Sequence, residues 1–228
     1  MTIYLDAGTT YSKIIAVDEK IPSLSAVNKR IVNGIEYNYY IIESKRVKTL
    51  NLNVKSACGH MTGSEINENE IIALAKGAQK YVEKNATILD LGSRDAKWVS
   101  FKDGKFHDMD WNSACASSTG ATVEMLLKFY DLTANDLQFN SEKFNITCGI
   151  FGLEKIMESI SKGENASIAV SRFIHGIAYN AWIFAKKPEK LYLSGGFCEN
   201  KCLVDSLNNY CNVIPLGRFL LCEGLIDE

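Results

Sequence analysis

The chain is poor in the features that mark linkers, membrane segments and secreted proteins. It has only three prolines in 228 residues and no Gly/Ser-rich stretch, which argues against domains joined by a flexible linker. No apolar run approaches the length needed to cross a bilayer, and the opening MTIYLD has no basic n-region. A net charge of −2 gives no electrostatic case for nucleic acid or anionic membrane. We therefore expect a cytoplasmic protein without nucleic-acid or membrane partners.

The seven cysteines include no C-x-x-C pair. That absence argues against a zinc ribbon or a ferredoxin-type cluster built from one chain. The odd count and the lack of a secretory signal argue against a disulfide framework. We expect five of the thiols to be free and buried: Cys58, Cys198, Cys202, Cys211 and Cys222.

The chain does contain a short sequence motif that occurs twice, as YLDAGTTYSKIIAV at 4–17 and ILDLGSRDAKWVSF at 88–101. Alignment of the two copies matches Asp6 with Asp90, Gly8 with Gly92, Thr9 with Ser93 and Lys13 with Lys97. Each copy predicts a hairpin whose tip carries a carboxylate and a glycine turn rich in N–H groups, which suits phosphate and metal-bound water. Two such tips would grip a polyphosphate and its Mg²⁺. The alternative is two ordinary hairpins with polar turns.

A third segment supports the pair. KLYLSGGF at 190–197 predicts a short strand that runs into Gly195–Gly196 and then a helix, an arrangement that lets a backbone pass close under a charged or flat ligand. Apolar spacing elsewhere predicts further elements. Helices are expected at 68–83, 117–131, 151–162, 165–186 and 199–210, strands at 2–6, 13–18, 86–91, 97–101 and 190–194, strand-like sequence at 31–43, and a last apolar segment at 217–226.

These motifs resemble those of a known family. D-A-G-T-T-Y-S-K and D-L-G-S-R-D-A-K resemble the two phosphate loops of the BadF/BadG/BcrA/BcrD ATPases, part of the actin-like ATPase superfamily. That family includes the activators of 2-hydroxyacyl-CoA dehydratases. N-S-A-C-A-S-S-T-G at 112–120 and T-C-G-I-F-G-L-E-K-I at 147–156 resemble its two cysteine segments. The resemblance covers 1–18 and about 57–226.

The resemblance implies an α/β, actin-like (ribonuclease H-like) ATPase fold with two interleaved lobes and a nucleotide cleft. We place the N-terminal lobe at 1–83 and the C-terminal lobe at 84–228. The last segment, about 211–228, is expected to pack back on the N-terminal lobe.

The resemblance also assigns the site. Asp6 and Asp90 are expected to act in catalysis and to hold Mg²⁺ through water. Glu70 either orients a water in catalysis or simply complements a helix start. Arg94 replaces a neutral amide of the family, and could bind the terminal phosphate or alter hydrolysis. The expected ATP/ADP contacts are Gly8, Thr9, Thr10, Lys13, Gly92, Ser93, Arg94, Asp95, Lys97, Thr119, Gly120, Gly195 and Gly196.

Cys115 and Cys148 each precede a predicted helix, whose positive end favours a thiolate. An iron–sulfur cubane needs four thiolates, and a two-fold dimer doubles the two on each chain. The resemblance implies one [4Fe–4S] cluster shared across a homodimer, from which ATP hydrolysis drives a low-potential electron to an iron–sulfur dehydratase or reductase partner. The alternatives are a small-molecule kinase of the same fold, and a nucleotide-binding regulatory protein without a cluster.

Overall fold

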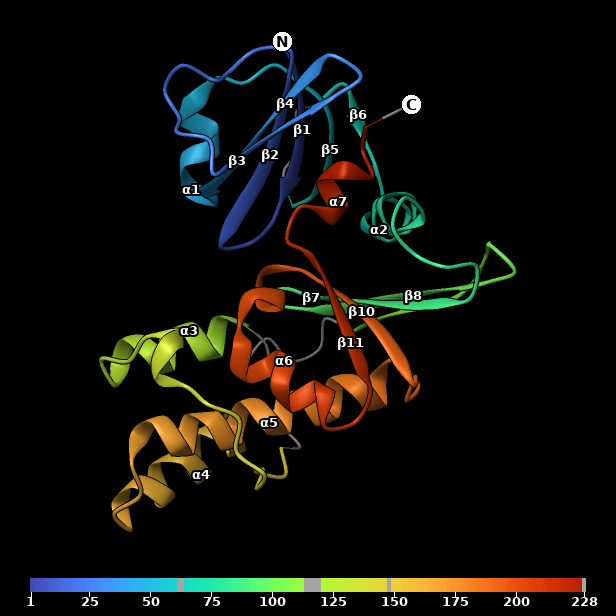
Figure 1. Cartoon of the computed structure of the whole chain (residues 1–228). Helices are drawn as coiled ribbons and strands as arrows, with labels where there is room; N and C mark the ends of the chain where they lie inside the picture. Colours follow the sequence, from blue (N-terminus) through green and yellow to red (C-terminus); the bar gives the residue numbers. More distant parts are fainter. Residues whose placement is uncertain (61–63, 113–119, 147–148, 227–228) are drawn as a thin grey trace. The chain divides into compact units, whose positions relative to one another are not determined.

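The chain divides into two units, each built on one β-sheet (Figure 1). Unit 1 comprises Met1–Val82 and Arg218–Glu228, and unit 2 comprises Glu83–Gly217. The computed structural model describes residues 1–60, 64–112, 120–146 and 149–226. In that part of the chain, no helix combines the length and the apolar character needed to cross a bilayer.

Unit 1 holds a six-stranded sheet in the order β3-β4-β2-β1-β5-β6. The strands are β1 (Thr2–Ala7), β2 (Tyr11–Val17), β3 (Asn28–Val32), β4 (Ile35–Glu43), β5 (Val54–Gly59) and β6 (Ile66–Asn67). β1, β2, β4 and β3 are successive antiparallel neighbours, whereas β5 runs parallel to β1. Ile3, Leu5, Ile14 and Tyr40 fill the core between this sheet and its helices.

The strand-like segment 31–43 is two strands rather than one. Asn33 and Gly34 join β3 to β4, with φ of 51° and 81°. Positive φ at both central residues is typical of the Asn-Gly hairpin turn, whose twist matches that of the flanking strands. The segment therefore forms an antiparallel hairpin at the edge of the sheet.

Three helical elements and a short 3₁₀ turn complete unit 1: α1 (Ser44–Val47), η1 (Lys48–Leu50), α2 (Glu70–Gln79) and α7 (Leu220–Glu223). Although α7 comes from the C-terminal end of the chain, it packs against α2, β1 and β2. The side chain of Glu223 accepts hydrogen bonds from Tyr81, Tyr39 and Arg30, at 2.7, 3.2 and 3.3 Å. This network fastens the end of the chain to the β3–β4 hairpin and to the end of α2.

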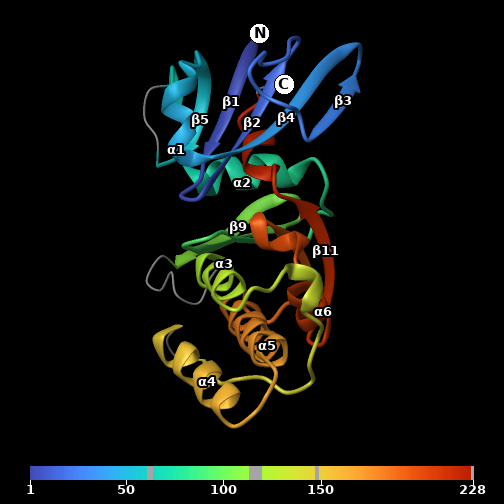
Figure 2. The same ribbon diagram turned by 90° about the vertical axis from the view of Figure 1, so that its left-hand side faces the viewer.

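Unit 2 holds a five-stranded sheet in the order β11-β10-β7-β8-β9, seen from two sides in Figures 1 and 2. Its strands are β7 (Ala86–Leu91), β8 (Ala96–Lys102), β9 (Lys105–Asn112), β10 (Lys190–Ser194) and β11 (Asn212–Gly217). Its helical elements are α3 (Gly120–Phe129), η3 (Ala134–Asp136), α4 (Gly149–Ser161), α5 (Ala166–Phe184), η4 (Gly196–Glu199) and α6 (Lys201–Asn208). The predicted helices are thus confirmed with ends that differ by a few residues: most are shorter than predicted, whereas α4 begins two residues before 151. The first residues of 117–131 lie outside the described part.

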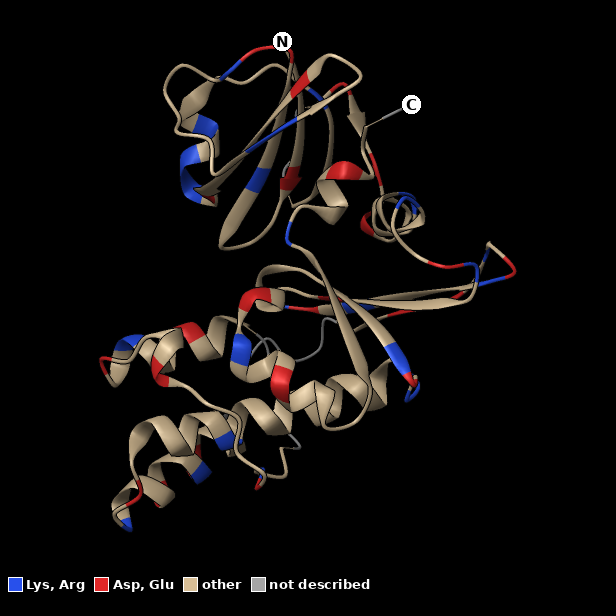
Figure 3. Ribbon diagram, viewed as in Figure 1, with Lys and Arg blue, Asp and Glu red and all other residues tan. Residues whose placement is uncertain are grey.

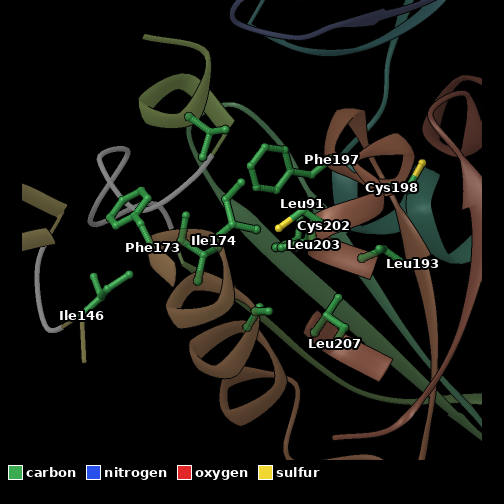
Figure 4. Packing of buried hydrophobic residues seen from close by; sticks show 14 of the residues in the cluster. Leu91, Ile146, Phe173, Ile174, Leu193, Phe197, Cys198, Cys202, Leu203 and Leu207 are labelled. Atoms are coloured by element: carbon green, nitrogen blue, oxygen red, sulfur yellow. The ribbon is translucent and has the colours of Figure 1, made fainter. Parts of the chain in front are cut away.

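The long helix α5 forms the base of the core of unit 2. Its residues Phe173 and Ile174 are fully buried, and they pack with residues of β7, β10 and α6, as Figure 4 shows. Asparagine side chains cap three helices by accepting the hydrogen bond of an early amide: Asn69 for α2, Asn165 for α5 and Asn200 for α6. Acidic and basic residues are interspersed along the elements of both units (Figure 3).

The five thiols expected to be structural are all buried, and none of the five forms a disulfide. Burial raises the pKa of the Cys211 thiol to about 11. Burial and the nearby Asp6 carboxylate raise the pKa of Cys222, whose Sγ lies 3.2 Å from the carbonyl oxygen of Tyr4. The thiols of Cys211 and Cys222 therefore stay protonated near neutral pH and serve as small apolar side chains.

Candidate functional site

The first hairpin joins β1 to β2 and brings Asp6 opposite Lys13. Lys13 Nζ donates to Asp6 Oδ2 at 2.9 Å, and Asp6 is only 5% exposed. Since β1 is a buried central strand, its end carries this carboxylate into low-dielectric surroundings, where a buried charge is costly without a partner of opposite sign. The thiol of Cys58, on β5, lies 4.0 Å from Asp6 Oδ1.

The turn after Asp6 contains Gly8, Thr9 and Thr10, and Thr9 is exposed. A Cβ on Gly8 would lie 2.5 Å from the carbonyl oxygen of Tyr11, so a larger residue would force this turn open. Ser44 Oγ donates to the Gly8 carbonyl oxygen at 2.5 Å and fixes the turn from the start of α1. The result is a tight glycine turn beside a buried carboxylate and an ammonium group.

The second hairpin, β7–β8, repeats the register, with Asp90 opposite Lys97. Its lysine lies farther from the strand-end carboxylate, with 3.8 Å from Nζ to Asp90 Oδ1 and 3.4 Å to Asp95 Oδ1. Lys97 is 3% exposed, and its ammonium group stands 5.3 Å from the centre of the Trp111 ring. Trp111 Nε1 donates to the other oxygen of Asp95 at 2.7 Å. The repeat is therefore a structural repeat, but with a second carboxylate and an aromatic ring added.

The turn of the second hairpin also receives the start of α3. The amide of Gly120 donates to the carbonyl oxygen of Gly92 at 3.2 Å, and that of Ala121 donates to Ser93 at 2.9 Å. Arg94 is exposed at the tip of this turn. The structure thus brings Gly120 to the glycine turn of the second hairpin.

The repeat extends to a third strand that the sequence analysis did not pair. β5 runs parallel to β1 and ends at Gly59, and β10 runs parallel to β7 and ends next to Gly195. The two glycines have φ of +94° and +92°, and a Cβ on either would collide with the backbone of the hairpin strand, at Ala7 and Leu91 respectively. Only glycine fits such a position. Gly196, by contrast, faces open space.

A local pattern marks Gly59 as the end of a strand, but it does not show which strand lies beside it. A-C-G at 57–59 and L-S-G at 193–195 are both strand ends with a small residue before glycine. Trp111 had no such signal, because its link to Asp95 depends on the pairing of β8 with β9. The contribution of these two residues was missed in the sequence.

Of the remaining candidates, Glu70 opens α2, where its charge complements the helix dipole. Thr119, Cys115 and Cys148 lie outside the described residues. Within the described ranges, no group of three or more His, Cys, Asp or Glu side chains could hold a metal ion.

The donor set fits a nucleotide and Mg²⁺ better than it fits a metal held by protein alone. Each hairpin offers a single buried carboxylate, from Asp6 or Asp90, next to a glycine turn. Mg²⁺ usually keeps several waters and takes one or two carboxylates, with phosphates completing its shell. Lys13 and Lys97 supply the positive charge that phosphate oxygens attract.

Comparison with known proteins finds sequence similarity to dehydratase activators. No family model matches the chain. It is 22% identical to the (R)-2-hydroxyglutaryl-CoA dehydratase activating ATPase of Acidaminococcus fermentans, over 96% of this chain and 92% of that protein. It is 20% identical to the activator of lactoyl-CoA dehydratase of Anaerotignum propionicum, over 89% and 85%. An uncharacterised protein of Methanocaldococcus jannaschii is 26% identical over 97% of both chains.

Solved structures of dehydratase activators have the same fold as this chain. The 2-hydroxyisocaproyl-CoA dehydratase activator of Clostridium difficile, with bound ADPNP, matches 98% of this chain and 92% of its own at a TM-score of 0.77 and 17% identity. Component A of the Acidaminococcus fermentans (R)-2-hydroxyglutaryl-CoA dehydratase matches at a TM-score of 0.72 and 17% identity, over 98% and 95%. The chain therefore resembles the dehydratase activators in sequence and has their actin-like α/β fold.

Proposed function

We propose that this chain is an ATP-binding and ATP-hydrolysing activator, acting in the cytoplasm, that passes an electron to a dehydratase or reductase partner. The observation that carries the proposal is the repeated hairpin, in which a buried Asp faces a Lys beside a tight glycine turn in each sheet. Support comes from relatives named as dehydratase activators over nearly the whole chain, and from an activator of the same fold with bound ADPNP.

In this proposal each hairpin has two tasks. Asp6 and Asp90 hold Mg²⁺ through water, and the ion, when bound, neutralises charge on the phosphates. The turns that begin at Gly8 and Gly92 present N–H groups and hydroxyls to phosphate oxygens. The remaining contacts to ATP or ADP come from Lys13, Lys97, Thr9, Thr10, Ser93, Arg94, Asp95, Thr119, Gly120, Gly195 and Gly196, and Glu70 orients a water.

The electron-transfer part of the proposal rests on Cys115 and Cys148. In the sequence, Cys115 stands five residues before the start of α3, and Cys148 directly precedes α4. We propose that these thiols ligate one [4Fe–4S] cluster shared across a homodimer, which supplies one-electron reduction when bound. The amides of Gly120 and Ala121, which bind the second turn, connect α3 directly to the phosphate-binding loop.

The ATP part is tested by calorimetry with Mg–ATP and with ATP in the presence of EDTA. We expect binding that weakens at least tenfold without Mg²⁺, because the carboxylates reach the nucleotide through the ion. A protein that binds no nucleotide under either condition would remove the basis of the proposal.

The cluster part is tested separately, by iron content after anaerobic reconstitution. About four iron atoms per dimer are expected for one cubane. Cys115→Ser and Cys148→Ser should each lose the iron, whereas Cys211→Ser, which alters a buried thiol of the core, should keep it. Full iron content in either of the first two variants, or a strictly monomeric reconstituted protein, would favour a kinase or a cluster-free regulatory protein instead.

A further inference from the structure

The second hairpin contains a buried cation whose position is set by a residue outside the hairpin. Lys97 is 3% exposed, and burial of an ammonium group is costly unless opposite charges surround it. Asp95 lies 3.4 Å from Nζ and Asp90 lies 3.8 Å from it. The ring of Trp111 adds a cation–π contact. The ammonium group is therefore shared by two carboxylates and an aromatic face.

The orientation of Asp95 is in turn set by Trp111. The indole N–H donates to Asp95 Oδ2 at 2.7 Å, while Oδ1 faces Lys97. A Cβ on Gly92 would lie 3.0 Å from Oδ1, so the carboxylate is also held against the backbone of the turn. With one oxygen held by the indole and the other against Gly92, the carboxylate has little freedom to rotate toward Lys97.

We propose that Asp95 and Trp111 are positioning residues that set where the Lys97 ammonium group stands when phosphate binds at the second turn. This inference rests on the proposed function, since it concerns the same nucleotide site. Without the indole N–H, Asp95 turns toward Lys97 and holds it more tightly. Lys97 then supplies less positive charge to the phosphates as negative charge develops on them during hydrolysis.

The turn of the second hairpin also accepts hydrogen bonds from both β9 and the start of α3. Trp111, near the end of β9, donates to Asp95, while Gly120 and Ala121, at the start of α3, donate to Gly92 and Ser93. A movement of the turn on nucleotide binding therefore acts on β9 and on α3 together. Trp111 and the first amides of α3 should both report nucleotide binding.

The experiment compares the ATPase kinetics of Trp111→Phe, Asp95→Asn and the double variant with those of wild type. Trp111→Phe keeps an aromatic face and loses the N–H, and should lower kcat about tenfold with KM changed less than about threefold, the size expected for a hydrogen bond to a charged acceptor. Because Trp111 acts through Asp95, the double variant should be no worse than Asp95→Asn alone.

Trp182→Phe is the matched control. It removes another indole N–H of unit 2, which donates to the Pro188 carbonyl oxygen at 3.1 Å. Its kcat should stay within about twofold of wild type, as for a residue that the site does not use. Protein labelled with 5-fluorotryptophan gives a second readout, because the chain has three tryptophans. Addition of Mg–ADP should shift the ¹⁹F resonance that Trp111→Phe removes, and leave that of Trp182 in place.

Two outcomes separate this inference from the proposed function. If wild type binds Mg–ATP but Trp111→Phe and Trp182→Phe have the same kcat, and the Trp111 resonance does not move, the positioning role is wrong and the nucleotide site stands. Additive losses in the double variant would also overturn it, because Trp111 would then act independently of Asp95. If wild type binds no nucleotide, both proposals fail together.

Discussion

The two hairpins share a register but hold their lysines differently. In unit 1, Lys13 Nζ lies 2.9 Å from Asp6, whereas in unit 2 Lys97 Nζ lies 3.8 Å from Asp90. The difference follows from one position of the repeat: Tyr11 in the first copy aligns with Asp95 in the second. Asp95 draws the second lysine toward itself and is in turn hydrogen-bonded by Trp111.

Within the proposed function, this comparison gives the two hairpins different roles. In unit 1, a 2.9 Å ion pair holds Lys13 against Asp6, the carboxylate proposed to orient Mg²⁺. In unit 2, Lys97 lies farther from each of its two carboxylates, so less free energy is needed to move its ammonium group toward a phosphate. The added groups are Asp95, in the turn before β8, and Trp111, on β9, and the same turn accepts hydrogen bonds from the start of α3. In the proposed function, the second hairpin therefore has the larger part in sensing the nucleotide.

The largest effect is expected at the third strand that both copies share. Gly59→Ala and Gly195→Ala should each lower the free energy of unfolding by about 3 kcal/mol, because each combines a positive φ with a collision against the hairpin backbone. Chemical denaturation monitored by circular dichroism measures this. Gly196→Ala is the matched control and should change stability by less than about 0.5 kcal/mol. A neutral Gly59→Ala would limit the structural repeat to two strands.

Loss of the strand-end carboxylate should destabilise the protein more in the first hairpin than in the second. Asp6→Asn removes a 2.9 Å ion pair and should cost about 2 kcal/mol, whereas Asp90→Asn leaves Lys97 beside Asp95 and should cost about 1 kcal/mol. Urea denaturation of each variant gives the two values. Glu36→Gln, which breaks the exposed pair with Lys29, should leave the midpoint unchanged. An equal cost for Asp6→Asn and Asp90→Asn would contradict the role given to Asp95.

Arg94 has no counterpart in the first turn, where Thr10 occupies the aligned position. If the exposed guanidinium binds the terminal phosphate, Arg94→Gln should raise KM for ATP about tenfold, or about 1.4 kcal/mol. Steady-state ATPase assays measure this, with Lys102→Gln at the far end of β8 as a control for charge alone. The same KM in wild type and Arg94→Gln would show that Arg94 is only a solvated residue.

The smallest effect concerns acid. Burial, with the nearby Lys143, lowers the pKa of His175, which lies on α5 and bonds the Tyr210 hydroxyl at 2.7 Å. Since the unfolded chain then binds a proton more readily than the folded one, stability is complete above the ordinary histidine pKa of about 6.5 and falls as the pH drops below it. Wild-type protein should therefore lose more thermal stability between pH 7.5 and pH 5 than His175→Gln does.

Tryptophan fluorescence can show whether the loss of stability at low pH arises in unit 2. Trp98, Trp111 and Trp182 all belong to unit 2, so tryptophan emission follows the unfolding of that unit. His107→Gln, which alters an exposed histidine of β9, should retain the wild-type dependence on pH. An unchanged pH dependence in His175→Gln would show that other groups cause the acid sensitivity.

The sequence predicted the structural features that depend on neighbouring residues. The spacing of Asp, Gly and Lys within each copy of the motif fixed the two hairpins, because a tight turn sets which residues face each other across two strands. Apolar periodicity likewise predicted the helices, whose ends were then set by caps such as Asn69 and Asn165.

What the sequence could not predict depends on distant pairing. Gly59 matters because β5 lies beside β1, some fifty residues earlier in the chain, and β5 itself was not predicted. Trp111 matters because β9 pairs with β8, in a strand whose residues are all exposed and therefore carry no apolar alternation. The β3–β4 hairpin, by contrast, could have been predicted from its turn residues Asn33 and Gly34. Local patterns specify turns and caps, whereas partners across a sheet follow from the fold as a whole.

The central proposal, that each hairpin contributes a carboxylate needed for ATP hydrolysis, is tested most directly by the ATPase activity of Asp6→Ala and Asp90→Ala. Each variant is first checked for a wild-type circular dichroism spectrum at the assay temperature. We expect kcat to fall at least about a hundredfold in both, since each removes a carboxylate that orients the Mg²⁺ of the nucleotide. Undiminished hydrolysis in either variant would show that its hairpin is an ordinary polar turn and would contradict the account.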